Sequence, residues 1–147
     1  MKIKDTKYQL MTIALEVFNN TNIERTKLNL KPFLWYGPLF YTASLRAEEI
    51  TELFSHTRPD NRSCFTAFDE TGIHYTQAAE NLAIGDYDSK SVVIDWMNSP
   101  GHRENILNDN TFLSVGVAKC SFDGPYKGGT AFVQLFLTGP PEEYQRR

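Results

Sequence analysis

Residues 112–137 read FLSVGVAKCSFDGPYKGGTAFVQLFL, and this stretch decides the fold class. Its first part, Phe112 to Cys120, places Leu113, Val115 and Val117 on one side of an extended chain, as a strand does. Glycines and a proline then mark a turn, and Ala131 to Leu137 is rich in aromatic and β-branched residues. The pattern predicts two antiparallel strands joined by a hairpin turn.

The segments before this hairpin are predominantly helical. Apolar residues recur at helical spacing from about Thr6 to the turn signal Asn19-Asn20, and again from about Pro38 to Ser55. Shorter elements follow: a helix over 65–71, an extended segment over 77–83, a helix capped by Asp88 or Ser89, and a turn or short helix over 101–107. Helices come early and the hairpin comes late, without βαβ alternation, which favours an α+β fold.

The composition predicts a single globular domain. The chain has 147 residues, of which 41% are hydrophobic and 13% aromatic, so one core accounts for its length. We expect one domain over 1–147, with a core over about 10–137 and a polar tail over 139–147. The net charge of −3 removes the simplest electrostatic argument for binding nucleic acid.

We also expect no membrane span and no signal peptide. No apolar run approaches the roughly 18 residues that a membrane span needs. The start of the chain does not read as a signal peptide, although the chain could be the mature part of an exported protein.

The candidate chemistry rests on three histidines. His56 follows a predicted helix end and His102 follows Pro100-Gly101, where a new helix would begin; both places favour side chains that point into a cleft. His74 has no acidic neighbour in sequence, and we interpret it as structural. The chain contains no established metal-binding motif, so spacing alone does not show whether His56, Glu80 and His102 converge.

Serine and cysteine chemistry has little support in the sequence. Ser99 lies three residues before His102, but its Ser-Pro context is typical of a cap or turn and is not a nucleophile elbow. Cys64 and Cys120 lack the basic surroundings of a reactive thiolate. The two cysteines allow at most one disulfide, and the sequence leaves open whether they pair.

Six segments, taken in order, resemble the CAP superfamily (cysteine-rich secretory proteins, antigen 5 and pathogenesis-related 1 proteins) in its bacterial, SCP-like form. The segments are residues 22–25 with 30–35, 43–49, 54–60, 79–83, 95–103 with 105–107, and 115–117. The resemblance implies a three-layer α-β-α sandwich with a small central antiparallel sheet. It also implies a cleft where two histidines and two acidic residues meet.

Carried over by motif, His56, Glu80 and His102 occupy three of those four cleft positions. The fourth falls on Ser99, so one carboxylate is missing, and Ala79 replaces the glycine that usually precedes the motif glutamate. Such a set could bind Zn²⁺ or another divalent metal through His56 and His102, while Glu80 orients one of the imidazoles. A structural role for Glu80, as hydrogen-bond partner of a buried histidine, remains the alternative.

The resemblance favours a secreted binding module over an enzyme, with a small ligand, a lipid or an extracellular macromolecule as its partner. One alternative is a hydrolase that uses Glu80 or His102 as general base in the same cleft. The other is a structural or adhesion module whose cleft is inert. The sequence does not select the ligand or the oligomeric state.

Overall fold

A computed structural model describes residues 3–139, so the polar tail predicted over 139–147 lies outside the described residues except for Gly139. The elements are α1 (Ile3–Lys27), β1 (Leu34–Trp35), α2 (Gly37–Ile50), α3 (Thr66–Glu70), β2 (Gln77–Gly85), α4 (Ser91–Met97), α5 (Pro100–Leu107), β3 (Phe112–Lys119) and β4 (Thr130–Thr138).

The predicted hairpin forms the centre of one four-stranded sheet with the order β1-β3-β4-β2. β3 pairs antiparallel with β4, from Phe112 opposite Leu137 to Lys119 opposite Thr130. β2 adds antiparallel to the other side of β4, where it forms one edge of the sheet. The predicted antiparallel sheet is thus formed by β2, β4 and β3, and the two-residue strand β1 adds to its other edge, parallel to β3.

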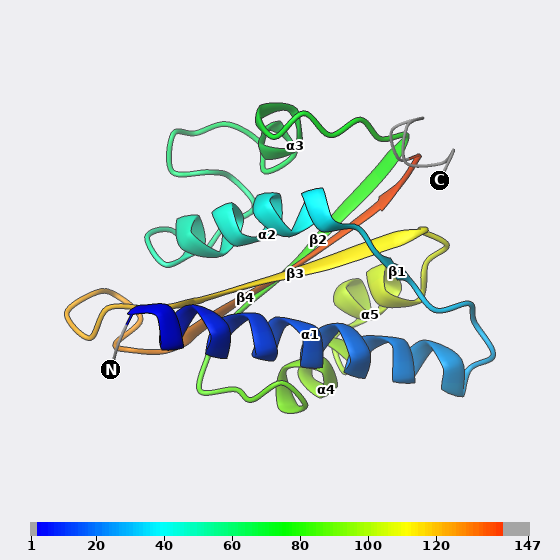
Figure 1. The fold of residues 1–147 in the computed structure, drawn as a ribbon, viewed down its shortest axis with the longest axis horizontal. Helices are drawn as coiled ribbons and strands as arrows, with labels where there is room; N and C mark the ends of the chain where they lie inside the picture. The colour runs from blue at the N-terminus through cyan, green and yellow to red at the C-terminus, as the bar shows by residue number, and fades with distance from the viewer. Residues whose placement is uncertain (1–2, 140–147) are drawn as a thin grey trace.

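Helices cover both faces of the sheet, which confirms the three-layer α-β-α sandwich. α2 and α3 lie on one face, and α1, α4 and α5 lie on the other (Figure 1). β3 and β4 are buried along almost their whole length because both of their faces are covered. Two cores result, one on each face of the sheet, with Phe68 and Leu135 in the first and Trp96 and Phe136 in the second.

A glycine sets the distance between α2 and the sheet. A Cβ atom on Gly116 of β3 would lie 2.1 Å from the backbone oxygen of Ala43 in α2. Only a residue without a side chain permits this approach, so Gly116 fixes how closely α2 packs on β3.

The first helix is longer than predicted: α1 continues through Asn19-Asn20 to Lys27. The helix continues past this signal because two nearby asparagine amides bond outside it. Asn20 donates to the backbone oxygen of Ser89, and Asn22 both donates to the backbone oxygen of Phe33 and accepts from its N–H. Tertiary contacts therefore override the local turn signal.

The other helices follow the prediction more closely. α2 has Pro38 in its first turn as expected, but it ends at Ile50 and not near Ser55. The short helices α3 and α5 form as predicted, and α4 begins where the Asp88 carboxylate accepts the N–H groups of Lys90 and Ser91. None of the helices in the described part of the chain is long and apolar enough to span a membrane.

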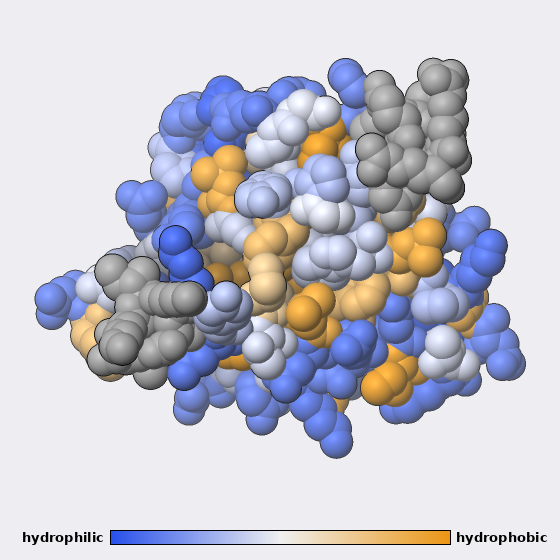
Figure 2. Space-filling view, in the orientation of Figure 1, coloured by the Kyte–Doolittle hydropathy of each residue, from blue (hydrophilic) through white to orange (hydrophobic). Residues whose placement is uncertain are grey.

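An apolar groove of about 430 Å³ lies between α1 and α2. The groove is lined by apolar side chains from α1 (Leu10 and Met11), α2 (Phe40) and β3 (Val117). Lys7 and Glu48 add one charge of each sign. Figure 2 shows apolar side chains gathered on this face between the two helices. The groove contains none of the predicted site residues.

Candidate functional site

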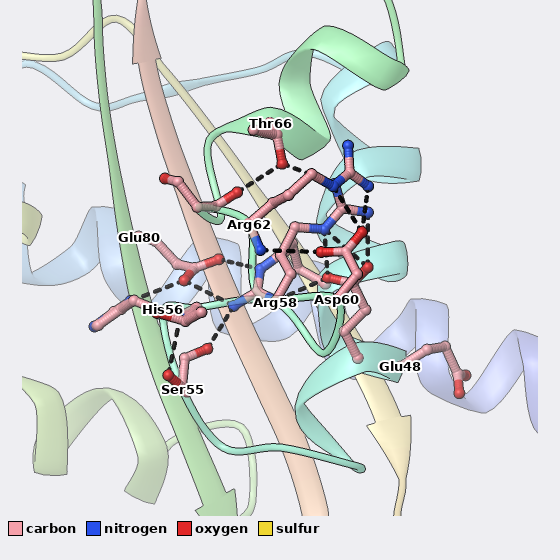
Figure 3. Close-up of polar contacts among 12 residues, drawn as sticks. Glu48, Ser55, His56, Arg58, Asp60, Arg62, Thr66 and Glu80 are labelled. Carbon is pink, nitrogen blue, oxygen red and sulfur yellow. Dashed lines mark hydrogen bonds and ion pairs between the residues drawn. The ribbon is translucent and has the colours of Figure 1, made fainter.

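Glu80 lies at the centre of the site, on the edge strand β2. Its side chain is 1% exposed and makes a two-point ion pair with the fully buried guanidinium of Arg46 in α2. Arg46 Nε donates to Oε2 at 2.7 Å and Nη2 donates to Oε1 at 3.0 Å. His56 Nδ1 lies 2.8 Å from Oε1, so α2, the loop that follows it and β2 meet at one carboxylate (Figure 3).

These contacts keep Glu80 ionised. Burial alone would raise the pKa of Glu80, but the hydrogen bonds from His56 and Arg46 and the Arg46 charge hold it below the ordinary value. A carboxylate in this state is a strong hydrogen-bond acceptor for His56 and a weak proton acceptor.

Arg46 also connects the site to a chain of ion pairs of alternating charge, which runs from Arg46 through Glu49 and Arg58 to Glu70. Its Nη1 donates to Glu49 at 2.8 Å, and its Nη2 donates to the backbone oxygen of Ser55 at 2.8 Å. Glu49 in turn accepts from Nε and Nη2 of Arg58. Arg58 also pairs with Glu70 at 2.8 Å, so the loop carrying His56 is joined to both α2 and α3. The hydrogen bonds with Glu49 first, and with Glu70 second, raise the pKa of Arg58.

The last ion pairs of this chain lie within the same loop and join it to α3. Arg62 pairs with Asp60 at 2.6 Å (Figure 3). It also pairs with Glu70. Inside the loop, the N–H of Cys64 donates to the backbone oxygen of His56 at 2.9 Å. The position of His56 is therefore set by backbone and side-chain contacts together.

The His56 ring has one bonded and one open nitrogen. Its side chain is 60% exposed, and no residue in the described range 3–139 hydrogen-bonds Nε2. The imidazole is thus anchored through Nδ1 and presents Nε2 to solvent.

His102 comes from the opposite helical layer, in the first turn of α5. Its Nδ1 is buried and has no hydrogen-bond partner among the described residues. Burial first, and the charge of His56 second, lower the pKa of His102, while Asp95 acts in the opposite direction. Because its pKa lies below 6.5, the neutral form of the His102 imidazole predominates at pH 7.

Asn81 connects His102 to the core. This fully buried amide donates to the backbone oxygen of His102 at 3.1 Å and to Gln134 Oε1 at 3.0 Å, and it accepts from Asn105 at 2.8 Å. Gln134 then donates to Thr21 in α1. Glu80 and Asn81, adjacent in β2, serve the two opposite faces of the sheet at its edge.

The remaining predicted residues have other places. Ser99 precedes α5 as its N-cap residue without a side-chain capping bond, and no hydrogen bond among the described residues joins its side chain to Glu80, His56 or His102. His74 lies exposed between α3 and β2. Cys64 and Cys120 are both buried free thiols, which answers the disulfide question left open by the sequence.

Two residues of the site were missed as participants. The first is Arg46, which lies at helical spacing with Ala43, Ala47 and Ile50. A charged residue on the apolar face of α2 was the sequence feature that could have identified it. Cys64 is the second: ligand atoms of His56, Cys64 and Glu80 all lie within 4.8 Å of one another. Burial, and then the Glu80 charge, raise the pKa of the Cys64 thiol to about 12.

Comparison with known proteins follows the same motifs. The profile of the family described as "CAP: Cysteine-rich secretory protein family" matches residues 18–136. Two Bacillus subtilis (strain 168) proteins are similar in sequence: "Uncharacterized protein YkwD", 36% identical over 124 residues, and "Uncharacterized membrane protein YlbC", 32% identical over 120 residues. The matches cover 83% and 78% of this chain but only 46% and 35% of those proteins, so the chain spans less than half the length of these relatives.

Solved structures agree with the fold. An extracellular protein containing a SCP domain from Bacillus anthracis str. Ames superposes with a TM-score of 0.77 at 25% identity, over 95% of this chain and 44% of the other. An outer surface protein from Borrelia burgdorferi superposes with a TM-score of 0.69 at 24% identity, over 83% of this chain and 89% of the other. The motifs, the sandwich and these matches agree: this chain belongs to the cysteine-rich secretory protein (CAP) family.

Proposed function

We propose that this CAP domain is a secreted binding module in which His56 and His102 hold a divalent metal, with Zn²⁺ as the first candidate. The observation that carries the proposal is the anchoring of His56: Nδ1 contacts a buried carboxylate at 2.8 Å while Nε2 stays open. A histidine that binds a metal commonly has this arrangement, because the carboxylate fixes the ring and its tautomer.

His102 supplies the second nitrogen in this proposal. Its lowered pKa keeps the imidazole neutral at pH 7, which is the form that binds metals. Its buried Nδ1 has no partner in the described part of the chain, and such a buried polar atom calls for an explanation. A metal that uses two neutral imidazoles and water fits both observations.

The charge balance favours zinc over calcium or magnesium. Arg46 neutralises Glu80, and Ser99 replaces the second carboxylate of the motif, so little negative charge remains for a hard cation. Imidazole ligands suit Zn²⁺ and its neighbours in the transition series.

The hydrolase alternative is weaker for Glu80 than for His102. Glu80 has a pKa below the ordinary value and its oxygens accept from both Arg46 and His56, so it is poorly suited to take a proton from water. A peptide and ester panel with Glu80→Gln as reference tests the alternative, and turnover in the wild type above that reference would support it.

The secreted location rests on relatives named extracellular and outer surface proteins.

Zinc titration by calorimetry tests the proposal. We expect saturable heat for the wild type and its loss in the His56→Ala/His102→Ala double variant, because both nitrogen ligands are gone. His74→Ala is the matched control, since it removes an exposed histidine outside the site and should leave binding intact. Equal and negligible heats in the wild type and the double variant would end the metal proposal and favour an inert-site adhesion module.

A further inference from the structure

We propose that His56, Cys64 and Glu80 form a second metal position, on the Nδ1 side of the His56 ring, that takes thiophilic divalent cations such as Cd²⁺ and Co²⁺. It shares the His56 ring with the metal site proposed above but does not need His102. Its supporting observation is the convergence of three ligand atoms of different chemistry within 4.8 Å.

Two of the three ligands are held in place before any ion binds. Cys64 is 3% exposed, and its N–H is bonded to the backbone oxygen of His56. The loop between them is pinned further where Thr57 and Ser63 form an antiparallel bridge. Glu80 is fixed by Arg46, whose Nε donates to Oε2 and whose Nη2 donates to Oε1, and Oε1 keeps a second lone pair for an ion.

The third ligand can complete the site by a small movement. Tetrahedral zinc-like coordination places neighbouring N, O and S ligand atoms about 3.3–3.5 Å apart. The 2.8 Å distance between His56 Nδ1 and Glu80 Oε1 must therefore lengthen by about 0.5 Å, while the Cys64 sulfur, now within 4.8 Å of the other two ligand atoms, must come closer to them by at most about 1.5 Å. His56 is the exposed member, at 60%, so its ring can make that movement and leave the fourth position to water.

The donor set selects the cation. Binding removes the proton of the thiol, so that Cys–SH and M²⁺ give Cys–S–M⁺ and one H⁺ released to solvent; the neutral His56 ring carries its proton on Nε2 while Nδ1 binds the ion. Thiolate and imidazole ligands suit Cd²⁺, Co²⁺ and Zn²⁺, whereas Mg²⁺ and Ca²⁺ prefer oxygen ligands, so this donor set excludes the latter two.

The two metal positions exclude each other on one molecule. A neutral imidazole has a single ring nitrogen with a free lone pair, so the ring binds through Nδ1 or through Nε2. The cation therefore decides which nitrogen is used, and His102 matters only to the Nε2 position.

Titration of the reduced chain with Cd²⁺ and Co²⁺, followed by the thiolate-to-metal charge-transfer absorption, tests the inference. We expect the band in the wild type together with release of one proton per bound ion, and at least about tenfold weaker Cd²⁺ binding without the band in Cys64→Ser. Cys120→Ser, which removes the other buried thiol, should keep the band. Cys64→Ala serves as a second variant, and circular dichroism confirms that both Cys64 variants are folded.

The outcomes separate this site from the proposed function. A band that persists in His102→Ala supports the Nδ1 position, even where zinc binding through His102 has failed. Saturable Co²⁺ binding without a charge-transfer band in the wild type, or a band that survives Cys64→Ser, overturns the inference and leaves the His56–His102 proposal standing. A band lost in His102→Ala also overturns it, because the two positions would then be one.

Discussion

The buried ion pair of Arg46 and Glu80 is the feature whose removal should cost the most stability. We consider Glu80→Gln, which keeps the shape of the side chain but removes its charge. Both side chains are at most 1% exposed, so solvent cannot replace the lost interaction. The glutamine amide also turns a donor toward either Arg46 or His56, both of which donate to the present carboxylate.

The expected loss follows from what remains around Arg46. Removing one partner of a buried pair typically costs about 3–5 kcal/mol in the free energy of unfolding. Arg46 keeps its bonds to Glu49 and the backbone oxygen of Ser55, so we expect the lower end, about 3 kcal/mol. The double variant Arg46→Met/Glu80→Gln should lose about 2 kcal/mol less than the sum of the single variants, because it leaves no unpaired charge.

Urea unfolding at pH 7, followed by circular dichroism, measures all four members of this double-mutant cycle. Glu52→Gln, an exposed carboxylate on the turn after α2, is the control and should change the free energy of unfolding by no more than about 0.5 kcal/mol. Single-variant losses that add to within about 0.5 kcal/mol, or a Glu80→Gln loss below about 1 kcal/mol, would refute the reasoning.

Two further predictions concern pH and packing. The folded state lowers the pKa of His102, so the unfolded chain takes up the proton at a higher pH than the folded chain does. The free energy of unfolding should therefore fall as the pH drops below 6.5. His102→Gln should flatten that part of the pH profile, and an unchanged profile would contradict the lowered pKa of His102. Gly116→Ala places a methyl group into the backbone of Ala43 and should cost about 1–3 kcal/mol or more, measured by the urea midpoint; a wild-type midpoint would mean that α2 does not pack as described.

Local sequence patterns predicted most of the fold. The spacing of apolar residues and the turn residues predicted the hairpin, α2 and the short helices without any information on tertiary contacts. The end of α1 was not predictable in this way, because Asn20 and Asn22 find partners at Ser89 and Phe33, outside the helix. The parallel strand β1 is only two residues long, too short to carry a periodicity.

The site was predicted in part. The motif resemblance selected His56 and Glu80, which the structure brings into contact, and His102, whose pKa responds to His56. Arg46 and Cys64 were missed because their contribution depends on contacts across 34 and 16 residues of chain to Glu80. No local pattern distinguishes a helix arginine that pairs inside the protein from one on a solvated face.

The adjacent pair Glu80-Asn81 has a consequence for folding specificity. Each residue is satisfied only on its own side of the sheet, the carboxylate by Arg46 and the amide by Gln134 and the α5 backbone. If β2 slipped by one residue along β4, the two side chains would exchange faces, and a carboxylate would be buried without its cation. The apolar residues of β2 are mostly small and discriminate weakly between registers, whereas this dipeptide does so strongly. The residues that build the site therefore also penalise the misregistered sheet, so the correct pairing of the edge strand and the geometry around His56 are selected together.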